Sequence, residues 1–353
     1  MSNFFVYPTT AEAKTQRGLQ GVAKQRSPLF KRMLLILLSL WVGTPTNAQN
    51  TGEYNQPSYA SQLGWPADAR VLILHIDDAG MSAESNRGTI RALTEGVANS
   101  FSVMMPTPWV PGMVAYIKKH PTVDAGLHLT LNAEWSHYRW GPLAGKPQVP
   151  GLVDQQGALW PSVEQVVANA TPAEVALEIA AQLDRAHSMG FTPTHLDSHM
   201  GALFADPKFL QSYIQLGVTA GIPVMFPGGH NHYAQQDYGP RATTQARATG
   251  KAIWAQGLPV LDDLHNASYG WPREDKLARY TEAIVGLQPG VTMMIMHCTE
   301  PSQNFANISD SGPSRYGDLE AMLSPELRKV LRDERIILTT WRELMQRRRA
   351  LPD

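Results

Sequence analysis

An alternation of short apolar runs with helix-like stretches begins near Ala69 and constrains the fold more than any other feature. The runs are rich in Val, Ile, Leu and Met and are not strictly alternating, which is typical of strands buried on both faces of a parallel sheet. We place the runs at Val71–Ile76, Ser100–Met105, Ala125–Leu131, Thr194–Asp197, Ile222–Phe226, Val291–His297 and Ile336–Leu338. About seven such strands, separated by helices, predict βαβ units and suit an α/β fold of the distorted (β/α) barrel type, with an open sheet as the alternative.

The stretches between the runs carry helix-start signals. Thr171 is a good capping residue, Pro172 suits the first helical position and Glu174 the third, and apolar residues then recur at helical spacing. The tripeptide at positions 324–326, Ser-Pro-Glu, repeats this signal before the last run. We therefore expect long helices between the strands.

Residues 1–48 have the features of an N-terminal extension with a secretory signal peptide. Lys31 and Arg32 precede the apolar run Met33–Val42, and small residues follow as far as Ala48. The run is shorter than the roughly 20 residues that a membrane span needs. We expect cleavage near Ala48 and export to the periplasm or the medium, with no membrane span in the mature chain; an uncleaved anchor is the alternative.

We expect residues 49–68 to form a linker and residues 69–353 a single domain, with insertions near 135–161 and 227–272. Long insertions in compact domains often form lids or binding loops. Asp262, Asp263 and His265 lie in the second insertion and follow no convincing apolar strand, so we interpret them as an exposed acidic turn. A lid that contributes to substrate binding is the alternative.

Charge and cysteine content exclude some classes of protein. The 30 Lys and Arg residues nearly balance the 31 Asp and Glu residues, so nothing in the charge favours a nucleic-acid partner. The single cysteine, Cys298, excludes an internal disulfide framework. Stability must therefore come from packing of the apolar core.

Two adjacent carboxylates, Asp77 and Asp78, directly follow the first apolar run. At a strand end they would repel each other unless a cation or a proton lay between them. A division of roles resolves the conflict, because one can bind a divalent metal ion while the other takes a proton from water. The alternative is that Asp78 caps the next helix and Asp77 is solvated.

Histidines occur in three later runs. His128 and His297, each taken alone, fit a buried core histidine as readily as a functional one. His195, Asp197 and His199 are alternate residues, so on a strand they would share one face. Burial of three polar groups on one face costs free energy unless they coordinate an ion or form hydrogen bonds. His195 and Asp197 are candidates to hydrogen-bond a metal-binding histidine on the side away from the metal. A surface strand is the alternative.

The residues discussed above belong to three motifs, which occur along the chain in the order Asp-Asp-x-Gly, Gly-Leu-His-Leu-Thr-Leu and His-x-Asp-Ser-His. Together they resemble those of the YdjC/ChbG-like (HpnK-like) carbohydrate deacetylases, from Val71 to roughly Leu338. The resemblance implies a distorted barrel of the NodB/YdjC-like glycoside hydrolase and deacetylase type. It also implies one divalent ion, zinc or magnesium, and removal of N-acetyl groups from an amino sugar or a chito-oligosaccharide.

The same resemblance assigns roles to individual residues. It implies that Asp78, His128 and His199 bind the metal, that Asp77 is the general base and that His297 is the general acid. Two positions depart from the family pattern: position 79 has alanine where phenylalanine is common, and position 201 has glycine where a second histidine is common. These departures spare the ligand set and affect the choice of sugar.

The expected partner is a carbohydrate substrate, and the sequence does not indicate an oligomeric state. Two other functions remain as alternatives. One is hydrolysis of another acyl or glycosidic bond, and the other is an exported, metal-containing carbohydrate-binding protein without turnover. Adjacent aspartates fit a two-carboxylate glycosidase poorly, because they would not straddle a substrate.

Overall fold

The computed structural model describes residues 56–352, apart from the side chains at positions 236–238, 240 and 241. In this part of the chain seven strands form one sheet in the order β4-β3-β2-β1-β6-β5, and β7 pairs with β1. All the pairings are parallel. The strands are β1 (Arg70–Ala79), β2 (Ser100–Val103), β3 (Ala125–Leu129), β4 (Leu196–Ser198), β5 (Asp263–His265), β6 (Gly290–Met296) and β7 (Ile337–Leu338).

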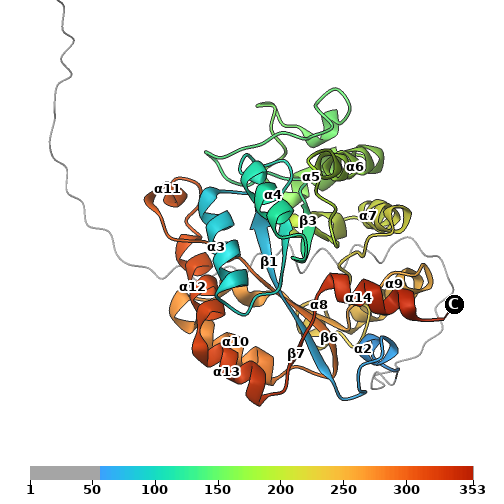
Figure 1. The fold of residues 1–353 in the computed structure, drawn as a ribbon. Helices are drawn as coiled ribbons and strands as arrows, with labels where there is room; N and C mark the ends of the chain where they lie inside the picture. The colour runs from blue at the N-terminus through green and yellow to red at the C-terminus, as the bar shows by residue number, and fades with distance from the viewer. Residues whose placement is uncertain (1–55, 353) are drawn as a thin grey trace, which may run out of the picture.

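Helices surround the strands, as Figure 1 shows. Contacts join α3, α10, α12 and α13 into one group and α6 with α7 into another. The helices are α2 (Tyr59–Gln62), α3 (Ala83–Thr94), α4 (Val110–Lys119), α5 (Val163–Asn169), α6 (Pro172–Ser188), α7 (Pro207–Ala220), α8 (His232–Tyr238), α9 (Pro240–Ala255), α10 (Lys276–Val285), α11 (Gln303–Ala306), α12 (Gly312–Leu323), α13 (Pro325–Asp333) and α14 (Trp341–Ala350).

The helix-start signals in the sequence act as expected. Thr171 caps α6, and the Glu174 carboxylate accepts a hydrogen bond from the Thr171 backbone N–H, which completes a capping box. Ser324 caps α13 with its hydroxyl, which accepts from the backbone N–H groups of Glu326 and Leu327. Each cap satisfies backbone N–H groups that have no partner inside the helix.

The sheet curls until its two edges approach each other. The segment 223–228 bridges them, because Leu196 donates its backbone N–H to Pro223 and Leu261 donates to Phe226. The predicted α/β fold, a distorted barrel of about seven parallel strands, is confirmed, and it takes the form of a curled parallel sheet with helices around it. The predicted strand Ile222–Phe226 is present only as isolated bridges. Pro223 and Pro227 have no N–H to donate, so a regular ladder cannot extend through this segment.

The interpretation of Asp262–His265 as an exposed turn is wrong. Asp262 and Asp263 are buried, and Asp263 begins β5. The Asp262 carboxylate accepts hydrogen bonds from the backbone N–H groups of Tyr59, Ala60 and Val291 at 2.8 to 3.0 Å. Backbone donors replace water around this carboxylate, and they attach α2, at the end of the predicted linker, to the barrel.

Two further expectations concern the signal peptide and membrane-spanning helices. The predicted signal peptide, with cleavage near Ala48, lies outside the described residues. Between residues 56 and 352, no helix combines the length and apolar character that a membrane span requires.

Candidate metal centre

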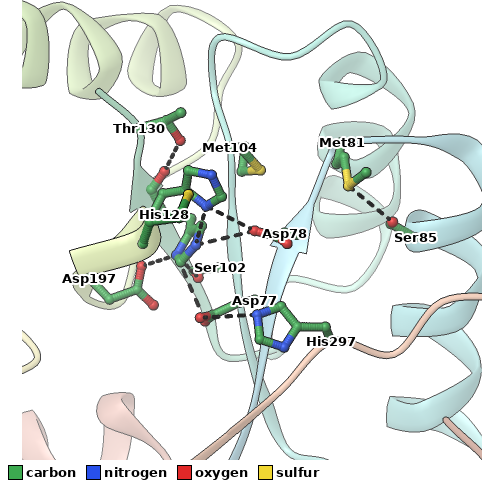
Figure 2. A network of polar contacts seen from close by, with 12 residues as sticks. Asp77, Asp78, Met81, Ser85, Ser102, Met104, His128, Thr130, Asp197 and His297 are labelled. Atoms are coloured by element: carbon green, nitrogen blue, oxygen red, sulfur yellow. Dashed lines mark hydrogen bonds and ion pairs between the residues drawn. The ribbon is translucent and has the colours of Figure 1, made fainter. Parts of the chain in front are cut away.

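The polar residues of the site come from the carboxyl ends of neighbouring strands, where α/β barrels carry their active sites. Figure 2 shows Asp77 and Asp78 at the end of β1, His128 on β3 and His297 just beyond β6. His199 begins the short helix η3 (His199–Phe204), directly after β4. All five side chains are predicted site residues, and the fold brings them together.

A bulge at the end of β1 turns both aspartates toward the same centre. Successive side chains on a regular strand point to opposite faces. The pairing of β1 with β2 shifts between Ile76 and Ala79, and Asp78 has a left-handed backbone with φ of 66°. Such a bulge redirects one side chain. As a result, Asp77 and Asp78 both reach His128, with their nearest oxygens 3.7 and 3.3 Å from its ring nitrogens.

Three predicted ligands converge on a small volume. Asp78 Oδ1 lies 3.3 Å from His128 Nε2 and 3.2 Å from His199 Nδ1, and the two ring nitrogens are 3.2 Å apart. All three residues are buried, and they form one of the groups in this part of the chain that could hold a metal ion.

The other nitrogen of each imidazole faces a carboxylate. His128 Nδ1 lies 2.7 Å from Asp197 Oδ1, and His199 Nε2 lies 3.1 Å from both carboxylate oxygens of Glu134. Imidazoles that donate to these carboxylates direct their remaining lone pairs at each other and at Asp78. That convergence is unfavourable unless a proton or a metal ion lies between them.

The donor set fits a divalent ion. Tetrahedral zinc holds its ligand atoms about 3.3 to 3.5 Å apart, because its bonds to nitrogen and oxygen are about 2.0 to 2.2 Å long. The three separations of 3.2 to 3.3 Å are close to that range. Asp78 Oδ1 is also buried without a well-formed hydrogen bond. These residues could therefore bind a metal ion with little rearrangement.

A buried arginine neutralises the outer oxygen of Asp78. Arg315 Nη1, from α12, lies 2.7 Å from Asp78 Oδ2, and both side chains are about 2% exposed. Burial opposes the charge on Asp78, but the Arg315 guanidinium and the adjacent His128 and His199 imidazoles hold the pKa of this carboxyl well below its usual range. Asp78 is therefore ionised and available to bind a cation.

Asp77 has a different environment. Burial raises its pKa, against the lowering effects of the His128 and His75 imidazoles. Its Oδ1 atom is buried without a well-formed hydrogen bond, although His75 Nε2 lies 3.2 Å away. A carboxylate with a raised pKa and an available oxygen is suited to accept a proton.

His297 approaches Asp77 at Oδ2, whereas His75 and His128 approach Asp77 at Oδ1. Its Nε2 atom is 3.9 Å from Asp77 Oδ2, and its ring packs edge-on against Tyr269 at 4.9 Å between centroids. Its backbone N–H donates to Asp318 Oδ2 at 3.0 Å. Burial lowers the pKa of His297 well below its usual range, so the imidazole is neutral at neutral pH.

Asp197 and His195 both lie inside the barrel but differ in their contacts. Asp197 accepts from His128, whereas His195 Nε2 approaches only Asp197 Oδ2, at 3.9 Å. The His195 ring stacks on Trp341 and meets His75 edge-on. His195 therefore contacts none of the three predicted metal ligands. It approaches Asp197, which in turn contacts the predicted ligand His128.

Comparison with known proteins supplies the family. The family model described as YdjC-like protein matches residues 71–333. This chain belongs to the YdjC-like family.

Curated YdjC-like relatives match along nearly their whole length. A carbohydrate deacetylase of Thermus thermophilus is 29% identical over 287 residues, which cover 78% of this chain and 94% of the relative. A carbohydrate deacetylase of Brevibacillus brevis is 28% identical over 276 residues, or 77% of this chain and 99% of the relative. A crystal structure of an Enterococcus faecalis V583 protein, 21% identical, superposes with a TM-score of 0.66 over 78% of this chain and 99% of its own, and it supports the fold.

Three residues of this YdjC-like site were missed by sequence reasoning: His75, Glu134 and Arg315. His75 precedes Asp77 by two positions on β1, so strand alternation could have revealed it. Its Nε2 lies 2.9 Å from Asp197 Oδ2, and the neighbouring carboxylates of Asp197 and Asp77 outweigh burial and raise its pKa to about 9. Arg315 lies far from the motifs in sequence. Glu134 follows the Gly-Leu-His-Leu-Thr-Leu motif by three residues, but no local pattern marks it.

Proposed function

We propose that this chain is a metal-dependent carbohydrate deacetylase that removes N-acetyl groups from an amino sugar or a chito-oligosaccharide. The curated relatives carry the name carbohydrate deacetylase. The observation that carries the proposal is the convergence of two imidazoles and one carboxylate beside an aspartate with an available oxygen. Amide hydrolysis needs both an electrophilic centre and a base.

Asp78, His128 and His199 would hold the ion. When bound, a divalent ion acidifies water and withdraws charge from an acyl oxygen. Two nitrogen ligands favour zinc or another transition ion over magnesium, which prefers oxygen ligands. Arg315 keeps Asp78 ionised, and Asp197 keeps His128 in the tautomer whose Nε2 lone pair faces the centre.

The protons move through Asp77 and His297. Asp77 takes a proton from the attacking water, which its raised pKa favours. The neutral His297 cannot protonate a leaving amine until it gains a proton itself. Asp77 Oδ2 lies 3.9 Å from His297 Nε2, so the proton taken from water can pass to His297 and then to the amine.

The decisive experiment combines metal analysis with acetate release. We expect about one divalent ion per chain and acetate release from N-acetylated chito-oligosaccharides that a chelator abolishes and added metal restores. Metal without acetate release would direct the search to other acyl or glycosidic bonds. Absence of both metal and acetate release would contradict the proposal.

The variant Asp77→Asn tests the base. The amide cannot accept the proton, so we expect turnover to fall by about 10²- to 10⁴-fold, while metal content stays at the wild-type level. The change is nearly isosteric and spares Asp78, which keeps the ligand set intact. Turnover near the wild-type rate would show that another group is the base.

We also propose that the protein is exported after cleavage near Ala48, on the basis of the N-terminal sequence. Cell fractionation followed by N-terminal sequencing of the exported chain tests this. A chain retained in the cytoplasm with its N-terminus intact would contradict the proposal.

A further inference from the structure

Glu134 belongs to no motif that the sequence singled out, yet it contacts a predicted metal ligand. Its two carboxylate oxygens both lie 3.1 Å from His199 Nε2. The opposite ring nitrogen, Nδ1, lies 3.2 Å from Asp78 Oδ1. The His199 ring is therefore held between Glu134 on one side and the metal centre on the other.

The environment of His199 mirrors that of His128. His128 presents Nε2 to the centre and faces Asp197 with Nδ1, whereas His199 presents Nδ1 and faces Glu134 with Nε2. In both cases a carboxylate accepts from the outer nitrogen. Such an acceptor fixes the tautomer, so that the inner nitrogen keeps its lone pair for a metal ion.

Glu134 is itself held in place. Asn132, which is fully buried, donates from Nδ2 to Glu134 Oε2 at 3.2 Å. The next residue, Trp135, packs its ring 6.4 Å from the His199 ring. The segment 132–135 thus contacts His199 with both a carboxylate and an aromatic ring, and a rigid support of this kind restricts rotation of the imidazole.

We propose that Glu134 is a positioning residue for the metal centre, which orients His199 and fixes its tautomer as Asp197 does for His128. The inference rests on the proposed metal-dependent function. Glu134 acts through His199 and is not among the three residues that would bind the metal. Its loss therefore weakens metal binding without removing a ligand.

The test measures metal affinity without reference to turnover. The purified full chain is stripped of metal and titrated with Co²⁺ against a chromogenic chelator. For Glu134→Ala we expect Co²⁺ affinity to fall by about 10- to 100-fold. For Glu134→Gln we expect a smaller loss, because the amide oxygen can still accept from His199 Nε2. The visible Co²⁺ spectrum at saturation should keep its intensity, since the three ligands remain.

Asp154→Asn provides the matched control. Asp154 lies in the insertion at 135–161 and pairs with Arg139 at 2.7 Å, and its contacts are with residues other than His199. Its affinity for Co²⁺ should equal that of the wild type. An equal loss in this control would assign the effect to folding of the insertion and would overturn the inference. A folded Glu134→Ala chain with wild-type affinity would overturn it as well, while leaving the proposed function intact. A wild-type chain that binds no Co²⁺ would overturn the proposed metal dependence itself.

Discussion

Asp77 and Asp78 are chemically identical neighbours whose environments give them different properties. Asp78 faces two imidazoles and the Arg315 guanidinium, which hold its pKa well below the usual range despite burial. Burial dominates at Asp77 and raises its pKa. Groups whose surroundings separate their pKa values are suited to different roles, here a ligand and a base. At the scale of the residue, neighbours from distant parts of the chain decide the chemistry.

Replacement of Arg315 tests its role as the counter-ion of Asp78. In the metal-free chain, Arg315→Met should lower the free energy of unfolding by about 3 kcal/mol, because it leaves a buried carboxylate without its cation. Saturating metal should reduce that loss, since the ion supplies positive charge. Urea unfolding with and without metal measures both effects.

The control is Arg279→Met, which removes an exposed pair with Asp275. Exposed pairs contribute little, so this change should cost less than about 1 kcal/mol. Equal losses in the two variants would contradict the role given to Arg315.

At the scale of the element, the barrel interior depends on a small residue in β3. Gly126 faces the ring of His195, which directly precedes β4, and a Cβ atom at position 126 would lie 2.4 Å from His195 Nε2. The ring cannot move easily, because it is fully buried and stacks on Trp341. The absence of a side chain at Gly126 leaves room for the His195 ring where β3 pairs with β4.

Gly126→Ala should therefore lower the free energy of unfolding by about 1 to 3 kcal/mol through overpacking. Gly270→Ala is the matched control, because a Cβ atom there has nothing within 4 Å. We expect the control to change stability by less than about 0.5 kcal/mol. Thermal or urea unfolding compares the two, and a neutral Gly126→Ala would show that His195 can move aside.

At the scale of the whole molecule, the interior contains many titratable groups, and some are kept neutral. His265 on β5 lies between the rings of Tyr233 and Trp271, and burial lowers its pKa to about 4. Asp262 and Asp263 lie beside it, and burial raises the pKa of each to about 6. Because these pKa shifts have opposite directions, protonation of His265 and protonation of the two aspartates change the free energy of unfolding in opposite directions.

His265→Phe isolates one of these contributions. Between pH 6.5 and about 4 the unfolded chain binds a proton at position 265 that the folded chain does not, so stability falls as pH decreases. At pH 5 this amounts to about 2 kcal/mol, by the linkage of one pKa unit to 1.36 kcal/mol. We expect the wild type to lose about that much more stability than His265→Phe between pH 7 and pH 5, measured by urea unfolding of metal-free protein.

Asp262 and Asp263 act in the opposite direction over pH 4 to 6, because the folded chain then binds the extra protons. Both aspartates are present in the wild type and in His265→Phe, so their contributions cancel in the comparison. Parallel pH profiles for the two chains would contradict a neutral, buried His265.

The sequence by itself determined the alternation of strands and helices, the helix starts and the strand-end positions of Asp77, Asp78, His128 and His297. These features are local, because strand alternation, capping and apolar runs depend on residues within a few positions of one another. The motif order was also sufficient to indicate the YdjC-like family. The ligand set followed from that resemblance, and the fold brings it together.

Only the tertiary structure decided how the site is completed. The bulge that turns Asp78 inward depends on the register of β1 against β2. The contacts of Glu134 with His199 and of Arg315 with Asp78 depend on how separate elements pack together. The burial of Asp262 and Asp263 likewise depends on backbone donors from α2 and α8, about 200 and 30 residues away in the chain. The local sequence does not distinguish a buried, hydrogen-bonded carboxylate from an exposed one. The backbone N–H groups that replace water around the buried carboxylate come from residues distant in the chain.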